Sequence, residues 1–498
     1  MKRSILGAAA RRAGLALAVG AALFAISSCR QTDGADGGKA AVGAAAEFAF
    51  RSSVESPPPG ESVPFKLSAN YPTAAPAACA PADCPWLTMN VNFDTSFPPK
   101  PVSWQGGGWD RYIASILTYV RKGQDPNLAD QVGFRPDIGG GGPRWFNVPW
   151  MAYDPSAGRE YRHGTTNERT AHLQDLIGPD GKPLVADDSV GAVHLFAGMS
   201  DACKGRYPEG FETWSVGYYN PQGGYAIGRS IPKDGVPKTA DYMGSQMLAG
   251  LPFPAGTVVV KVLTTNAPPE CVPALKGSPE WRVNRHVLGS KHGKPSYMCA
   301  RAVQVSRVVQ IDVAVTDPRS PTGWVYGTYA YDGNQPGATF WDRLVPLGVQ
   351  WGTDPWTFPA VPDGAASLPL QQSVANPAIG TGNLYEHMGC RGRLAGPVDN
   401  PQSSCVSCHA SAYAAKPGAK SVMGQNVPPS FGFDGLCTAY SADNASYFQN
   451  ARPPQSFAGG KYPDAMSLDT SLQLEVAMQQ YGQYATGKAP EPCVDSAS

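Results

Sequence analysis

Residues 309–316 read Val-Gln-Ile-Asp-Val-Ala-Val-Thr, a stretch in which apolar side chains recur at every second position. Successive side chains of a β-strand point to opposite faces, so this period of two predicts a strand with one buried face. Residues 257–263 (TVVVKVL) are rich in β-branched side chains and residues 323–331 (GWVYGTYAY) in aromatic ones, which also favours strands. Pro318 and Pro321 predict a turn between two of these strands.

The composition agrees with a β-rich protein rather than an all-helical one. The 498 residues include 56 Gly and 48 Pro, which favour turns and short strands. We expect residues 61–375 to form a β-rich domain, sandwich-like or irregular, with its best helix at residues 110–122, where apolar side chains recur on one face. Lys+Arg and Asp+Glu are both 40, so no basic surplus indicates nucleic-acid binding.

The N-terminus has the features of an export signal. Basic residues precede the apolar stretch 14–26, which is too short to span a bilayer and has the length of a signal-peptide core. The following Ser-Ser-Cys29 resembles the bacterial lipobox, at which Cys29 would be lipidated and become the mature N-terminus. An ordinary signal peptide with a nearby cysteine is the alternative.

We therefore expect residues 1–28 to be a lipoprotein signal peptide and residues 29–60 to be a flexible tether. The mature protein would be attached to a bacterial membrane by lipid, in the periplasm or on the outer side of the envelope.

The 11 cysteines fit an exported chain, in which disulfides are favoured. With Cys29 assigned to lipid and Cys405 and Cys408 to the motif below, up to four bridges are expected among the others. Cys79 and Cys84 are close enough to form a local loop, and the remaining pairings stay open. These other cysteines are residues 79, 84, 203, 271, 299, 390, 437 and 493.

Residues 405–409 read Cys-Val-Ser-Cys-His, the C-x-x-C-H pattern at which a c-type haem is attached. Two thiols on one helical turn can form thioethers to the two vinyl groups of a porphyrin, and His409 then faces the iron as its proximal ligand. A thioredoxin-like redox pair would need a βαβ context, and a structural zinc site would need a second ligand pair nearby. We expect one covalent haem c, held by Cys405, Cys408 and His409.

On these residues, the C-terminal region 376–498 resembles the cytochrome c family. The resemblance implies a small α-helical domain in which a downstream methionine, just before a C-terminal helix, is the second axial ligand of the iron. Met466 has this position and is the predicted distal ligand, with Met423 as second choice. Met478 is expected to be a core residue of the C-terminal helix.

Two helices are expected in this region. One contains the motif at residues 402–415, and the other covers residues 467–484 with Ser467 as its N-cap. Arg391 and Arg393 precede the motif, where they could neutralise haem propionates or be ordinary surface charges.

Residues 323–352 and 396–409 also resemble segments of uncharacterised bacterial proteins that end in a single cytochrome c motif. This resemblance implies one integrated architecture, in which the β-rich part forms a wall of the haem site. It implies no particular substrate or reaction.

Three functions remain open. The predicted function is a membrane-tethered electron carrier, whose iron has both axial positions filled and cycles between Fe(III) and Fe(II) with an unidentified redox partner protein. An oxidoreductase that binds its substrate in the β-rich domain is the first alternative, because most of the chain lies outside the haem region. A binding module for a partner or an envelope polymer, joined to a redox domain, is the second.

Overall fold

The architecture is taken from a computed structural model of the chain. It describes residues 70–93, 100–122, 145–147, 166–168, 201–207, 211, 213–230, 253–291, 294–354, 371–379, 388–389, 392–396, 404–409, 412–415 and 465–474. The expected signal peptide, Cys29 and the tether lie outside these residues. Among the helices that are described, none is both long and apolar enough to cross a bilayer.

The described part is rich in antiparallel strands, as expected. The helical segments are η1 (Pro85–Leu87), α2 (Trp109–Lys122), α5 (Asp201–Arg206), α6 (Pro221–Ser230), η3 (Pro273–Leu275), η4 (Trp341–Arg343), η7 (Pro377–Ile379) and α9 (Cys405–His409). The strands are β1 (Phe146–Asn147), β2 (Thr166–Glu168), β3 (Thr213–Tyr219), β4 (Val258–Thr265), β5 (Glu280–Lys291), β6 (Lys294–Thr316), β7 (Trp324–Tyr331), β8 (Leu344–Gln350), β9 (Ser373–Ala375), β10 (Tyr413–Ala415) and β11 (Ala465–Ser467).

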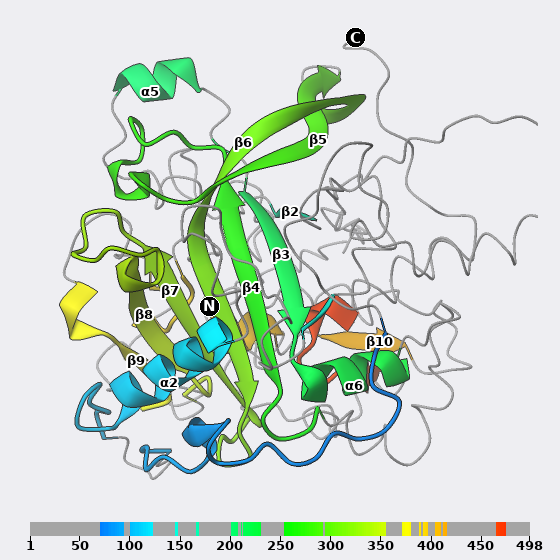
Figure 1. Ribbon diagram of the computed structural model, residues 1–498, viewed down its shortest axis with the longest axis vertical. Coiled ribbons are helices and arrows are strands. Elements are labelled where there is room, and N and C mark those ends of the chain that lie inside the picture. The colour runs from blue at the N-terminus through cyan, green and yellow to red at the C-terminus, as the bar shows by residue number, and fades with distance from the viewer. Residues whose placement is uncertain are drawn as a thin grey trace, which may run out of the picture.

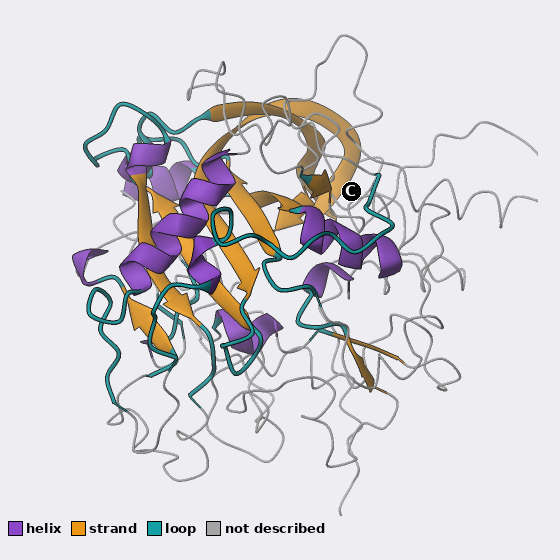
Figure 2. Cartoon of the chain, turned by 60° about the horizontal axis from the view of Figure 1, so that its bottom comes forward, coloured by secondary structure: helices purple, strands orange, loops and turns teal. Residues whose placement is uncertain are grey.

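Nine of these strands form one sheet in the order β1-β3-β4-β6-β7-β8-β9, with β2 paired to β3 and β5 paired to β6. Every pairing is antiparallel, and β10 and β11 form a separate two-stranded ribbon. The hairpin of β5 and β6 extends past the ends of the neighbouring strands and curves away from the sheet (Figures 1 and 2). Within the described residues, the strands form this one large sheet and the small ribbon rather than a sandwich.

The strands and the helix predicted from local patterns are confirmed. The alternating stretch 309–316 is the end of β6, and its residues 310–315 pair with β4 on one side and β7 on the other. The expected turn between β6 and β7 is closed by a hydrogen bond from the Asp317 amide to the Gly323 carbonyl, at 2.9 Å. Helix α2 begins one residue before the expected start and ends at Lys122.

Helix α2 covers one face of the sheet (Figure 1). Its buried side chains include Tyr112, Ile113 and Ile116. Gly327 of β7 allows the close approach, because a Cβ there would overlap Ile113. The Tyr329 hydroxyl donates to the Ile113 carbonyl, which fastens the helix to the same strand. Gly327 and Tyr329 therefore face α2.

The opposite face carries a row of cross-strand partners. Because neighbouring residues of a strand face opposite sides, Tyr326 lies on the face away from α2. The register pairs Tyr219 with Val259, Val259 with Ala314, Ala314 with Tyr326, and Tyr326 with Gln350. We name this the rear face, because α2 lies in front of the sheet in Figure 1.

Two disulfides are present among the described residues: Cys79–Cys84 and Cys203–Cys271. The first confirms the expected local loop. The second joins residues 68 positions apart. In the chain-entropy model, a crosslink of that span stabilises a fold by about 4 kcal/mol, because it lowers the conformational entropy of the unfolded chain.

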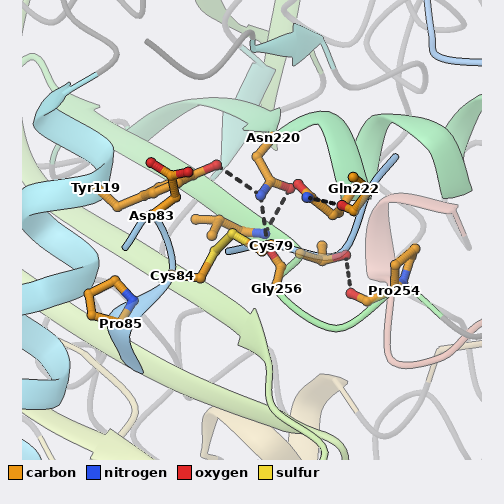
Figure 3. Close-up of a disulfide and its surroundings, with 12 residues drawn as sticks. Cys79, Asp83, Cys84, Pro85, Tyr119, Asn220, Gln222, Pro254 and Gly256 are labelled. Atoms are coloured by element: carbon orange, nitrogen blue, oxygen red, sulfur yellow. Dashed lines mark hydrogen bonds between the residues drawn. A yellow bond between two sulfur atoms is a disulfide. The ribbon is translucent and has the colours of Figure 1, made fainter. Parts of the chain in front are cut away.

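Asn220 organises the surroundings of the Cys79–Cys84 bridge (Figure 3). Its side-chain oxygen accepts from the Gly223 amide at 3.1 Å, which caps helix α6, and from the Val258 amide at 3.0 Å. Its nitrogen donates to the Gly256 carbonyl at 2.8 Å and to the Tyr119 hydroxyl at 3.1 Å. One buried amide thus joins the start of α6 to β4 and α2.

Candidate functional site

The C-x-x-C-H residues form the single helical turn α9, Cys405–His409. The expected longer helix over residues 402–415 is wrong, because the chain forms strand β10 from Tyr413. That strand pairs with β11, and the Leu468 amide donates to the Ala412 carbonyl at 3.0 Å. Pairing with a distant segment therefore ends the helix soon after His409.

The first N–H groups of any helix find no acceptor within the helix itself. In α9, these groups donate to residues outside the helix, and one of those residues belongs to the sheet. The Cys405 amide donates to the Leu394 carbonyl at 2.9 Å, and the Val406 amide donates to the side-chain oxygen of Gln350 at 3.0 Å. The Gln350 nitrogen donates to the Ser404 hydroxyl, also at 3.0 Å. Because Gln350 belongs to the row on the rear face, α9 lies over that face.

His409 is oriented by the backbone of a second segment. Its Nδ1 lies 2.9 Å from the carbonyl oxygen of Thr470. A carbonyl can only accept a hydrogen bond, so Nδ1 carries the proton and the lone pair of the neutral ring is on Nε2. Metal-binding histidines commonly have this arrangement, because it fixes the tautomer and the orientation of the ring. The Tyr326 ring packs against the imidazole, with 4.7 Å between their centroids.

A small pocket with a cavity volume of about 20 Å³, open to solvent, lies beside His409. Its floor is the rear face of the sheet, and residues 470–473 form a wall. Aromatic and aliphatic side chains predominate, so the pocket offers a dry surface next to the imidazole. The lining residues are Tyr219, Phe253, Val259, Ala314, Trp324, Tyr326, His409, Thr470, Ser471 and Gln473.

The polar groups of this pocket include two buried tyrosine hydroxyls. Tyr219 donates to the Gln473 side chain at 3.2 Å and lies 3.4 Å from the Ser471 hydroxyl, and Tyr326 donates to the Thr470 hydroxyl at 2.9 Å. Burial raises the pKa of Tyr219 well above its usual value. Tyr219 is therefore a neutral hydrogen-bonding group at physiological pH rather than a general base.

Met466 lies in strand β11, opposite Ala414 of β10. Ser467 ends that strand, so the expectation that it caps a helix is wrong. Ser471 has that role: its hydroxyl accepts from the Leu474 amide at 3.3 Å, and the helical residues described there begin at Leu472. Of the other methionines considered, residues 423 and 478 lie outside the described residues.

Arg393 is neither a surface charge nor a group exposed toward a propionate. Its side chain and that of Asp354 are both 0% exposed, and Arg393 Nε lies 3.2 Å from Asp354 Oδ2. Arg393 also donates to the Thr353 carbonyl at 2.9 Å. Burial raises the pKa of the Asp354 carboxyl, and the neighbouring guanidinium opposes this shift. Arg393 and Asp354 thus hold the segment around residue 393, just before the motif, against residues 353 and 354. Arg391 lies outside the described residues.

The donor set at α9 fits haem c. The backbone places Cys405 and Cys408 on one turn directly before His409, and the Thr470 carbonyl holds the imidazole in the tautomer that binds a metal through Nε2. Apolar side chains of the rear face lie beside it. Among the described residues, α9 included, no group of three or more His, Cys, Asp or Glu side chains is arranged to hold a metal ion by itself.

Sequence reasoning missed the rear-face row, Gln350 and Thr470. The row depends on the register of the strands. Its sequence signal is limited to the aromatic residues at positions 324 and 326. Thr470 contributes a backbone carbonyl, for which the sequence carries no signal.

No family model, curated protein or solved structure matches the chain.

Proposed function

We propose that this chain is a membrane-tethered mono-haem c-type cytochrome that carries electrons in the cell envelope. The observation that supports it best is the arrangement at His409. The residue ends a C-x-x-C-H helical turn, and its Nδ1–H is hydrogen-bonded to a backbone carbonyl. Such a bond is typical of a histidine that binds a metal through Nε2.

In this proposal, Cys405 and Cys408 hold haem c through thioethers, and His409 binds the iron. When bound, haem c supplies an iron that gains and loses one electron between Fe(III) and Fe(II). Gln350 fixes the turn that carries the thiols. The side chains of the rear face give the partly exposed imidazole a mainly apolar surrounding, which suits electron transfer better than hydrolysis.

Met466 is the proposed distal ligand, with Met423 as second choice. The pairing of β10 with β11 supports Met466, because it brings residue 466 beside residue 414, five positions after His409. An axial methionine raises the potential of a haem above that of a bis-histidine site.

Membrane attachment through lipid at Cys29 completes the proposal, with an unidentified redox protein as partner. A signal of the lipobox type is compatible with covalent haem attachment, because both belong to exported proteins. Localisation in the periplasm or on the outer side of the envelope follows from the same signal.

The test is covalent haem attachment in a host that exports the chain and attaches haem c. We expect one haem per wild-type chain, retained after denaturation, and none when Cys405 and Cys408 are both changed to Ala. The matched control is Ser407→Ala, which alters the same turn without removing a thiol and should keep the haem. A wild-type chain without covalent haem, or a double variant that retains it, would contradict the proposal.

The pocket beside His409 favours one second candidate, an oxidoreductase that binds its substrate in the β-rich part, in contact with the rear face. Carbon monoxide added to the reduced wild-type protein distinguishes the two. A spectrum that does not change indicates two filled axial positions and supports the carrier. Rapid formation of a carbon monoxide complex indicates an open position and supports the oxidoreductase.

A further inference from the structure

The turn that carries the Thr470 carbonyl has an unusual backbone. Asp469 and Thr470 are consecutive and both have positive φ angles, 50° and 64°. Residues other than glycine seldom adopt this left-handed region, and for a β-branched residue such as Thr470 it is a true outlier. Backbone of this kind persists only where the surrounding structure holds it, and it is concentrated at functional sites.

Side chains and backbone of the β-sheet region hold both residues of this turn. The indole nitrogen of Trp324 donates to Asp469 Oδ1 at 3.3 Å, and the Phe253 amide donates to Asp469 Oδ2 at 2.8 Å. The Tyr326 hydroxyl donates to the Thr470 hydroxyl at 2.9 Å. Trp324 and Tyr326 are alternate residues of β7, so one strand contacts both strained positions from the same face.

Tyr326 contacts both ends of the His409 hydrogen bond. Its ring packs against the imidazole of the donor, and its hydroxyl binds the side chain of Thr470, whose carbonyl is the acceptor. A change at Tyr326 should therefore alter the relative position of donor and acceptor. Tyr219 offers a contrast, because its hydroxyl binds Ser471 and Gln473 in the same pocket but not the strained pair.

We infer that Trp324 and Tyr326 are positioning residues for His409, acting through the Asp469–Thr470 turn. They hold Asp469 and Thr470 at positive φ, and this conformation keeps the Thr470 carbonyl within hydrogen-bonding distance of His409 Nδ1. The hydrogen bond makes the imidazole a stronger electron donor through Nε2. Since a stronger axial donor stabilises Fe(III), the pair also keeps the reduction potential low. The effect on potential rests on the proposed haem, whereas the positioning of the ring does not.

The experiment compares Tyr326→Phe with the matched control Tyr219→Phe in the full-length, haem-loaded protein. Both substitutions remove one hydroxyl from one pocket. We expect the midpoint potential of Tyr326→Phe to move to more positive values, while Tyr219→Phe stays at the wild-type value. Equal potentials in all three proteins, or the same shift in both variants, would overturn the inference.

A second measurement separates this inference from the proposed function. Nitrogen NMR of 15N-histidine-labelled protein reports which ring nitrogen of His409 carries the proton, whether or not haem is attached. We expect the Nδ1–H form in the wild type and in Tyr219→Phe, and a mixed population in haem-free Tyr326→Phe. An unchanged tautomer in Tyr326→Phe removes the positioning role. A wild type that lacks haem but has the Nδ1–H form removes only the proposed cytochrome.

Discussion

Arg393 illustrates how surroundings decide the role of a single residue. A basic residue close to a haem motif suggests a partner for propionates, yet this one lies fully buried beside Asp354. Asp354 Oδ1 also accepts from the amides of Gln371 and Gln372, at 2.9 and 3.0 Å. Asp354 itself has a positive φ of 53°, so the ion pair holds a strained corner of the chain.

Replacing Arg393 by Met should destabilise the protein strongly. It leaves a buried carboxylate without its cation, which typically costs about 3–5 kcal/mol, and it raises the pKa of Asp354 further. Urea unfolding of the purified variant measures the loss. The double variant Arg393→Met with Asp354→Asn should lose less than the single one, because the amide oxygen can still accept from the two backbone amides. A single variant within about 1 kcal/mol of the wild type would contradict this account.

At the scale of elements, α9 depends on the sheet more than on its own sequence. One turn of five residues is too short to be stable alone. Its amides instead find acceptors on Leu394 and Gln350. The same reasoning explains why Ser467 does not cap a helix: its backbone pairs in β11, and Ser471 is the first serine beyond that pairing.

Gln350→Leu should loosen α9. The Val406 amide would lose its acceptor in a buried place, and we expect the free energy of unfolding to fall by about 1–3 kcal/mol. The yield of covalent haem should fall with it. Gln371→Leu is the matched control, since its buried side-chain amide makes no hydrogen bond within the described residues, and it should be neutral or slightly stabilising. Urea unfolding and haem content of both variants check the prediction, and equal effects would refute it.

At the scale of the whole molecule, the core under α2 combines aliphatic side chains of the strands with several buried aromatic ones. Trp109 stacks on Trp351 with 4.0 Å between ring centroids, and Trp145 meets Tyr218 edge-on at 4.9 Å. Burial raises the pKa of Tyr119 to about 12, and it raises that of Tyr218 well above the usual value. The same holds for Tyr112 and Tyr329.

These buried phenols predict cooperative unfolding in alkali. In the unfolded chain they ionise at about pH 10, whereas the folded protein keeps them neutral. Their contribution is therefore complete below pH 10 and is lost as the pH rises toward the folded pKa values, by about 1.4 kcal/mol per pH unit for each group. Tyrosinate absorbance and circular dichroism, followed together from pH 9 upward, should change in one step. Full ionisation near pH 10 with unchanged circular dichroism would contradict the prediction.

The strands and the helix that could be predicted are those whose residues carry a local period. In the stretch 309–316, alternate apolar side chains pack under α2, and residues 110–122 repeat as a helix that packs on one side. The shortened α9 and strand β11 could not be predicted, because pairing between residues 413–415 and 465–467 overrides local helix preference.

The sequence by itself determined the chemistry to expect at residues 405–409, since the spacing of two thiols and an imidazole along one turn is local information. Only the tertiary structure decided which groups surround His409. Tyr326, Gln350 and Thr470 come together with it through the register of β7 and β8 and through a turn more than fifty residues away along the chain. Register and strand order depend on contacts between distant segments, and a linear pattern of residue types does not contain them.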